Sequence, residues 1–173
     1  MCGISGIVSP HPIIPETLHR MNQLIRHRGP DDEGFVLFRE DGKSVTAGGQ
    51  NTSRETWESH YQYRPSRKIL KLNEDFVLGL GHRRLSILDL SPAGHMPMCD
   101  LERRYWITYN GEVYNFLEIR RELKTLGYHF HTEPDTEVIL AAYREWGQEC
   151  LHKFMGMFAF ALVDTKDHTL FLA

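Results

Sequence analysis

The sequence lacks any long apolar run, has few cysteines, and shows no strong excess of charge of one sign. Its 173 residues hold 20 lysines and arginines against 23 aspartates and glutamates, which gives a formal net charge of −3. That balance creates no general attraction to nucleic acid or to an anionic membrane. No segment approaches the roughly 18 apolar residues of a membrane-spanning helix, and no signal-peptide pattern opens the chain. We therefore expect a cytoplasmic protein.

Cysteine is scarce, and its placement excludes two kinds of small domain. The three cysteines, Cys2, Cys99 and Cys150, are an odd number at wide spacing. This pattern argues against a disulfide scaffold and against a four-ligand zinc site. With 41% hydrophobic and 25% charged residues, the composition is typical of one globular domain over residues 1–173. Residues 39–74 are polar with weak periodicity, and we interpret them as a surface insertion.

Hydrophobic spacing predicts an α+β layered sandwich. Alternating or short apolar runs predict strands at 2–8, 34–38, 76–81, 105–109 and 128–132. A 3.6-residue spacing predicts helices at 15–27, 115–126 and 135–146, with Asn115 as an N-cap and with Gly127 and Gly147 as terminating residues. Residues 156–164 and 169–172 are expected to form a hairpin.

Cys2 is a candidate nucleophile because it directly follows the initiator methionine. Removal of Met1 would make Cys2 the N-terminal residue, which carries both a thiol and a free α-amine. The amine can accept the thiol proton, so one residue supplies the nucleophile and the base. Position alone is weak evidence, and a small buried hydrophobic residue is the simpler interpretation of an isolated cysteine.

Four further segments follow Cys2 in order along the chain. They are Arg26-His27-Arg28-Gly29-Pro30-Asp31, Gly81-His82-Arg83-Arg84-Leu85-Ser86-Ile87-Leu88-Asp89, Tyr109-Asn110-Gly111-Glu112-Val113-Tyr114-Asn115 and Asp135-Thr136-Glu137-Val138-Ile139-Leu140. Together with Met1-Cys2-Gly3-Ile4, this series resembles the glutaminase domain of asparagine synthetases, a class II glutamine amidotransferase. The resemblance covers nearly the whole chain apart from about residues 39–74. It implies a four-layer αββα sandwich of the N-terminal-nucleophile (Ntn) hydrolase type.

Asn110 and Gly111 are candidate oxyanion donors. Hydrolysis of a carboxamide needs hydrogen-bond donors aimed at the developing negative charge. An Asn side-chain amide and a Gly backbone N–H can supply them, and Gly allows a close approach because it has no Cβ. Taken alone, Asn-Gly between apolar residues favours a hairpin turn. The resemblance favours the oxyanion hole instead.

Glutamine is a zwitterion, so its pocket should present a cation and one or two anions. By resemblance, Arg84 holds the carboxylate, whereas an isolated arginine would suggest a surface salt bridge. By resemblance, Glu112 and Asp135 hold the ammonium group; N-capping of the helix at 135 is the other explanation for Asp135. The resemblance also implies that the backbone of four consecutive residues lines the pocket: Leu85, Ser86, Ile87 and Leu88.

The resemblance implies that the Cys2 thiolate converts glutamine to glutamate and ammonia through a thioester. It implies no cofactor for this domain; ATP and Mg²⁺ are expected only for an ATP-dependent synthetase domain, which this sequence lacks. The implied partners are L-glutamine and that covalently linked domain, with no nucleic acid and no membrane. A homodimer is left open.

Three alternatives stay open at this stage. His129 and His131 would share a face of the predicted strand and suggest a metal site, but no cysteine or carboxylate spacing completes a ligand set. A chain that retains Met1 would be an inactive or regulatory glutamine-binding module. An active domain could also supply ammonia to a different carboxylate acceptor.

The chain departs from the family's usual pattern at two positions. Met96 stands where glutamine is usual, and Pro134 stands where a small residue is usual.

Overall fold

The computed structural model describes residues 2–86 and 91–173, which form two facing β-sheets with helices on their outer faces. The first sheet has the order β1 (Gly3–Ile13), β5 (Phe76–Arg84), β2 (Asp32–Phe38), β3 (Ser44–Gly48) and β4 (Arg67–Lys68). The second has the order β6 (Met98–Cys99), β7 (Tyr105–Val113), β8 (Gly156–Asp164) and β9 (Thr169–Leu172). The helices are α1 (Pro15–Leu24), α2 (Arg54–Glu58), α3 (Phe116–Thr125) and α4 (Asp135–Trp146), and 3-10 turns lie at Arg26–Arg28, Ile69–Lys71, Pro92–Gly94 and Gly147–Lys153.

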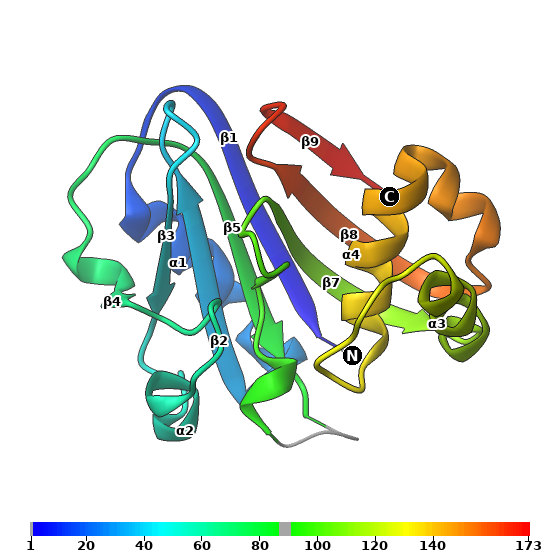
Figure 1. Ribbon diagram of the computed structural model, residues 1–173. Coiled ribbons are helices and arrows are strands. Elements are labelled where there is room, and N and C mark those ends of the chain that lie inside the picture. The colour runs from blue at the N-terminus through cyan, green and yellow to red at the C-terminus, as the bar shows by residue number, and fades with distance from the viewer. Residues whose placement is uncertain (1, 87–90) are drawn as a thin grey trace.

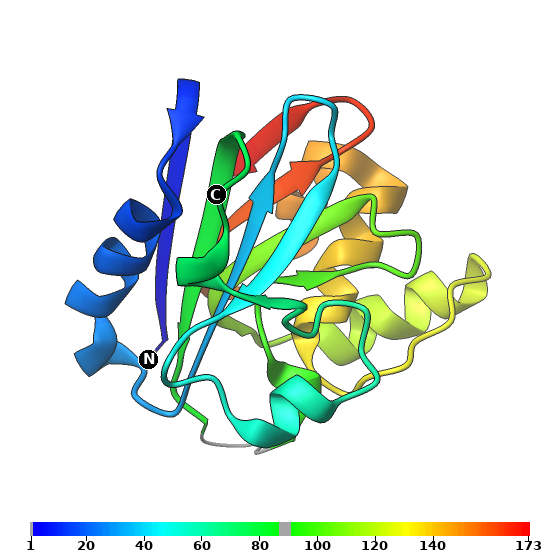
Figure 2. The same cartoon turned by 90° about the vertical axis from the view of Figure 1, so that its left-hand side faces the viewer.

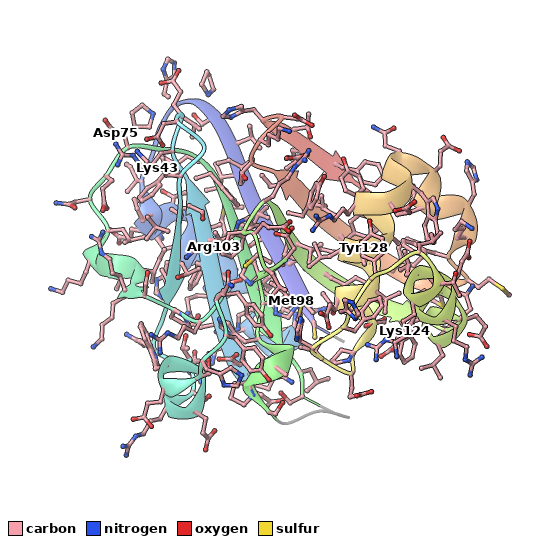
Figure 3. The ribbon with its side chains drawn as sticks, in the orientation of Figure 1. Lys43, Asp75, Met98, Arg103, Lys124 and Tyr128 are labelled. Carbon is pink, nitrogen blue, oxygen red and sulfur yellow. The ribbon has the colours of Figure 1, made fainter. Side chains whose placement is uncertain are left out.

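The four layers run from α1 through the two sheets to α3 and α4 (Figures 1 and 2). The N-terminus lies at one end of the interface between the sheets (Figure 1). Lys43 and Asp75 mark the opposite end of the first sheet (Figure 3). The expected αββα order is therefore confirmed.

Successive apolar side chains of β2 pack on opposite faces of the first sheet, so both faces are covered. Phe35 and Leu37 are buried in one core cluster with Leu18 of α1. Val36 and Phe38, one position out of phase, are buried in the other cluster, which includes the second sheet. Because successive strand side chains point to opposite faces, a continuous apolar run is what a doubly covered strand requires.

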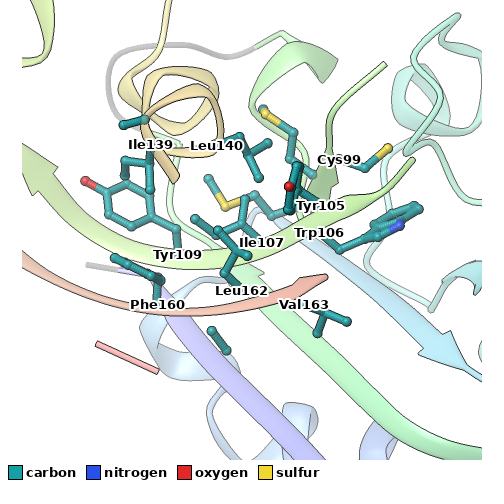
Figure 4. Close-up of a cluster of buried hydrophobic side chains, with 14 of the residues drawn as sticks. Cys99, Tyr105, Trp106, Ile107, Tyr109, Ile139, Leu140, Phe160, Leu162 and Val163 are labelled. Carbon is teal, nitrogen blue, oxygen red and sulfur yellow. The ribbon is translucent and has the colours of Figure 1, made fainter. Parts of the chain in front are cut away.

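The second sheet repeats this arrangement with larger side chains. Tyr109 and Ile107 of β7 lie under Ile139 of α4 (Figure 4). Trp106 points the other way, and its ring meets Phe38 of the first sheet edge-on at 6.1 Å between centroids. This aromatic pair is therefore one of the contacts that pack the two sheets against each other.

The predicted elements are confirmed at most positions, including the helices at α3 and α4 and the hairpin of β8 and β9. The helix expected at 15–27 ends at Leu24 and continues as a 3-10 turn. Leu24, the last residue of α1, is apolar but 80% exposed. No helix in the described ranges has both the length and the apolar character needed to cross a membrane.

Residues 39–74 differ from expectation. We predicted a surface segment, but β3 pairs with β2 along its whole length, and Ala47 and Ile69 are fully buried. The surface assignment is therefore wrong for this part of the segment. The residues of β3 are mostly small or hydroxyl-bearing, so their sequence shows too little apolar periodicity to predict a strand. The strand forms because β2 offers a partner for backbone pairing.

The strand expected at 128–132 is absent from the described structure. The Glu137 carboxylate accepts hydrogen bonds from the backbone N–H groups of His131 at 2.9 Å and Thr132 at 2.7 Å. A side chain therefore satisfies groups that a strand would pair in a ladder. The alternating sequence alone could not show this, because strand formation depends on an available partner.

Candidate active site

A cavity of about 770 Å³ opens where β1, β5 and β7 meet the start of α4. It brings together eight of the residues singled out in the sequence: Cys2, Arg84, Leu85, Ser86, Asn110, Gly111, Glu112 and Asp135. Ile87 and Leu88, also expected here, lie outside the described residues, as does Met1. Residues from both sheets and from α4 thus converge on one space.

Cys2 is positioned by the pairing of β1 with β5, in which Gly3 lies opposite Arg83. Its Sγ atom lies 3.4 Å from the backbone N of Leu85 and 3.9 Å from the carbonyl O of the same residue. The Leu85 N–H group therefore donates to the Cys2 sulfur and fixes its position beside the end of β5.

The other two cysteines differ from Cys2. Cys99 and Cys150 are buried, and burial raises their thiol pKa values to about 12 and about 11. Both therefore stay protonated at neutral pH. Cys2 is only partly buried and lines the cavity, so the interpretation of Cys2 as a small core residue is wrong.

The turn at residues 28–31 holds the backbone at Cys2 and at the end of β5. Arg28 Nε donates to the Cys2 carbonyl at 3.3 Å, and Asp31 Oδ2 accepts from the Ser86 backbone N–H at 2.8 Å. A Cβ on Gly29 would lie 2.4 Å from the Arg83 backbone, so only glycine fits there. The sequence motif contained these residues, but we assigned them no individual role.

Arg84 is a buried side chain of β5, 8% exposed, so it does not have the surface position that an isolated arginine would suggest. Its Nη1 donates to the Ser91 carbonyl at 2.8 Å. A Cβ on Gly94 would lie 2.2 Å from Nη2, so the guanidinium lies directly against the Gly94 backbone. The 3-10 turn at Pro92–Gly94 therefore forms the seat of the arginine that lines the cavity.

Asn110 and Gly111 lie within β7, so the hairpin turn that their sequence suggests is wrong. They pair with Ala159 and Phe158 of β8. Gly111 has φ +149°, and a Cβ there would lie 2.3 Å from the Met157 carbonyl. The backbone conformation and the close packing both require glycine.

Strand alternation gives the direction of the Gly111 N–H group. Phe160 exchanges both of its backbone hydrogen bonds with Ala173, on the side of β9. Tyr109 lies opposite Phe160, so its own N–H and C=O point away from β8. Gly111 stands two positions further along and points its N–H the same way, toward the edge of β7 that borders the cavity.

Two carboxylates line the side of the cavity formed by β7 and α4. Asp135 Oδ2 accepts from the Tyr109 hydroxyl at 2.6 Å and from the Val113 N–H at 3.0 Å. The N-cap of α4 is Pro134, so the N-capping explanation for Asp135 is wrong. Glu112 is exposed at the rim, and its pKa is raised first by partial burial and then by the charge of Asp135.

His82 and Tyr109 were missed as site residues, although both stand inside the quoted motifs. Burial lowers the pKa of His82 to about 3, so the ring is neutral at physiological pH. Its Nε2 lies 3.0 Å from the Tyr109 carbonyl, which can only accept, so Nε2 carries the proton and donates. This bond links the two sheets one residue before Asn110.

Arg120 holds the loop that precedes α4. Its Nη2 donates to three carbonyls in succession, those of Thr132 at 2.8 Å, Glu133 at 3.0 Å and Pro134 at 3.2 Å. Pro134 has φ −61°, the value that its ring imposes, so this departure from the family pattern fits its position. Met96, the other departure, is buried beside the cavity.

The described part of the chain contains no group of three or more His, Cys, Asp or Glu side chains arranged to hold a metal ion. His129 and His131 do not share the face of a strand, because residues 128–132 form none. The geometry that suggested a metal site is therefore not present.

Two facing sheets with a cysteine at the start of an edge strand define an Ntn-hydrolase type of fold. The structure is similar to glutamine phosphoribosylpyrophosphate amidotransferase from B. subtilis, complexed with ADP and GMP, with a TM-score of 0.70 at 18% identity over 95% of this chain and 35% of that one. The family model for the glutamine amidotransferase domain matches residues 66–173. The chain belongs to this glutamine amidotransferase family.

The curated relatives that match the chain over nearly its whole length include asparagine synthetases. The chain is 35% identical to asparagine synthetase [glutamine-hydrolyzing] 1 of Bacillus subtilis (strain 168) over 99% of its own length. It is 39% identical to asparagine synthetase [glutamine-hydrolyzing] 2 of Oryza sativa subsp. japonica over 100% of its length. It spans 22% and 23% of these relatives, respectively, so it corresponds to one part of larger proteins.

Proposed function

We propose that this chain hydrolyses L-glutamine to glutamate and ammonia, with Cys2 as the nucleophile. One observation carries the proposal: a single cavity holds the Cys2 thiol, the Asn110-Gly111 donors, the Arg84 guanidinium and two carboxylates. A cation at one side and anions at the other match the two charged ends of an amino acid. Membership of the glutamine amidotransferase family supports the same substrate.

In the proposed reaction, the α-amine of a Met1-free Cys2 accepts the thiol proton and the thiolate attacks the side-chain carbonyl of glutamine. The Asn110 amide and the Gly111 N–H donate to the resulting oxyanion. The carbon–nitrogen bond then breaks, and the nitrogen takes the proton from the amine and leaves as ammonia. Water attacks the γ-glutamyl thioester, the carbon–sulfur bond breaks, and glutamate is released.

The remaining groups orient the substrate. Arg84 binds the α-carboxylate, and Asp135 with Glu112 binds the α-ammonium group. Asp135 already accepts two bonds from Tyr109 and Val113, which fix the carboxylate before the substrate arrives. Such preorganisation places the side-chain amide of glutamine against Cys2.

We further propose that the ammonia supplies an ATP-dependent asparagine synthetase domain of the same polypeptide. The relatives are asparagine synthetases by name and are larger than this chain, and both facts support this assignment. The glutaminase step itself uses no cofactor, and ATP and Mg²⁺ belong to the synthetase step. A different carboxylate acceptor is the competing proposal, and assaying the full-length polypeptide with aspartate, ATP and Mg²⁺ separates the two.

The decisive experiment measures glutamate release from glutamine by protein whose Met1 is shown by mass spectrometry to be absent. Cys2→Ala should abolish release, because no other group in the proposal can form the thioester. Cys150→Ala is the matched control: it removes a buried thiol away from the cavity and should retain activity. Equal activity of the wild type and Cys2→Ala would refute the proposal.

A form with Met1 retained tests the inactive-module alternative. Its Cys2 nitrogen is an amide, which cannot accept the thiol proton. This form should bind glutamine in calorimetry without releasing glutamate. If protein without Met1 behaves in the same way, the chain is a binding module.

A further inference from the structure

A histidine outside the motifs is joined to the first sheet by a short buried bond. His95 Nδ1 lies 2.6 Å from Asp32 Oδ2, and the two side chains are 3% and 5% exposed. The Asp32 carboxylate also accepts from the Ser53 N–H at 3.3 Å. A carboxylate accepts and does not donate, so Nδ1 carries the proton of this bond. The pair ties the residue that ends a 3-10 turn to β2.

Further contacts hold the same 3-10 turn. The Tyr63 hydroxyl donates to the Ala93 carbonyl at 2.8 Å, and both residues are buried. A Cβ on Gly34 would lie 2.5 Å from the His95 ring and 2.2 Å from the Met96 carbonyl. The ring therefore packs directly on the β2 backbone. These hydrogen bonds and packing contacts together fix the position of the turn relative to the sheet.

This turn is the seat of Arg84. The Ser91 carbonyl accepts from Arg84 Nη1, and the Gly94 backbone lies against the guanidinium. Arg84 also stands directly opposite Asp32 in the pairing of β2 with β5. The His95–Asp32 bond thus closes a ring of contacts that begins and ends at this pair of strands, with the arginine inside it.

We infer that His95 is a positioning residue that sets the direction of the Arg84 guanidinium through the Pro92–Gly94 turn, and so sets selectivity for substrates that carry an α-carboxylate. The inference rests on the proposed function, in which Arg84 binds that carboxylate. Asp32 and Tyr63 belong to the same device. None of the three touches the reacting amide, so their loss should weaken recognition and leave the chemical step intact.

The test compares two substrates. Glutamine carries the α-carboxylate, and 4-aminobutanamide keeps the amide and the ammonium group but lacks it. His95→Ala should lower the preference for glutamine about tenfold, through a higher KM with little change in kcat. Ammonia release from 4-aminobutanamide should not change. His95→Asn should restore the preference, because its amide nitrogen can replace Nδ1 as a donor to Asp32.

A matched control separates positioning from general loss of stability. Asp164→Asn weakens the ion pair of another buried carboxylate, in which Asp164 Oδ2 lies 2.6 Å from Arg104 Nη2, beside Tyr105 at the end of β7 away from Asn110. It should lower stability and leave the preference between the two substrates unchanged. Tyr63→Phe, which removes the second tether of the turn, should shift the preference in the same direction as His95→Ala. Equal losses on both substrates in His95→Ala would overturn the inference.

Calorimetry distinguishes failure of this inference from failure of the proposed function. If the wild type binds glutamine without hydrolysing it, the proposed reaction fails and the inference stands on binding alone. His95→Ala should then weaken glutamine binding about tenfold and leave 4-aminobutanamide binding unchanged. Unchanged glutamine binding in His95→Ala, or no glutamine binding by the wild type, overturns the inference.

Discussion

The two sides of the cavity are built by different means. On the side of Cys2 and Arg84, the walls are largely paired strands, and a buried ion pair between Glu33 and Arg83 ties β2 to β5. On the side of Asp135, part of the wall is the loop at 131–134, which pairs with no strand. Its backbone is held by two side chains, Arg120 from α3 and Glu137 from α4. Strand pairing places Cys2 and the backbone of Arg84, whereas side chains hold the backbone of the loop beside the two carboxylates.

We expect a substitution on the strand-built side to cause the larger loss in the free energy of unfolding. Arg83 and Glu33 lie 2.7 Å apart with both side chains 0% exposed, and Glu33 also accepts from the Asn51 N–H. Glu33→Gln leaves the guanidinium buried without its counter-charge. We expect the free energy of unfolding to fall by about 3–5 kcal/mol, measured by urea denaturation.

An exposed ion pair provides the control for this prediction. Arg54 and Glu58 lie on one face of α2 at 2.7 Å, with side chains 86% and 62% exposed. Glu58→Gln should change the free energy of unfolding by less than about 0.5 kcal/mol, because water screens the pair. Similar losses for the two variants would contradict the assigned role of burial.

The loop-built side should respond through the substrate as well as through stability. Arg120→Met keeps much of the apolar stem of the side chain but removes the donors to three carbonyls. We expect a loss of about 2–3 kcal/mol in the free energy of unfolding, together with a rise in the KM for glutamine. Urea denaturation and steady-state kinetics measure the two effects. A loss of stability with an unchanged KM would show that the loop does not shape the site.

The same contrast explains what could be predicted from the sequence. The strands β1, β2, β5 and β7 and the helices α3 and α4 were predicted because their apolar periodicity reflects burial on one or both faces. Residues 128–132 have a similar alternation but pair with no strand in the described part of the chain. Local pattern cannot report the presence of a partner, so the strand prediction failed there.

The candidate site shows the same division. Cys2, Arg84 and Asn110 were proposed because they stand in an ordered series of motifs that resembles a known family, although each residue taken alone favoured a simpler interpretation. His95 and Asp32 are 63 positions apart, and their pairing exists only after β2 and the Pro92–Gly94 turn meet. Residues that act through another residue leave no local pattern, so the supporting groups of the site could be assigned only from the structure.

A smaller effect is expected from the phenol that holds Asp135. Tyr109→Phe removes a single hydroxyl, which donates to the Asp135 carboxylate at 2.6 Å. The Val113 N–H remains in place as the second donor. We expect the KM for glutamine to rise about fivefold with a modest change in kcat, in line with the loss of one hydrogen bond. A large fall in kcat would place the hydroxyl in the chemical step instead.

The smallest effect is expected at the rim, from the titration of Glu112. Burial and the neighbouring Asp135 raise its pKa above the ordinary value of 4.5. Its carboxylate therefore takes up a proton at a higher pH than an isolated glutamate does, and the ammonium group of glutamine loses one of its two anions. The KM for glutamine should rise as the pH falls through this raised pKa and should level off above it.

Glu112→Gln tests this assignment, because the amide carries no charge at any pH. The variant should show a KM raised a few-fold at neutral pH, without the acidic rise that belongs to Glu112. Stability should respond in the opposite direction: ionisation of a carboxyl with a raised pKa destabilises the fold, so unfolding becomes easier as the pH rises between 4.5 and the raised value. Urea denaturation across that interval should show the decline in the wild type and a weaker decline in Glu112→Gln. An unchanged KM profile in the variant would assign the acidic rise to another group.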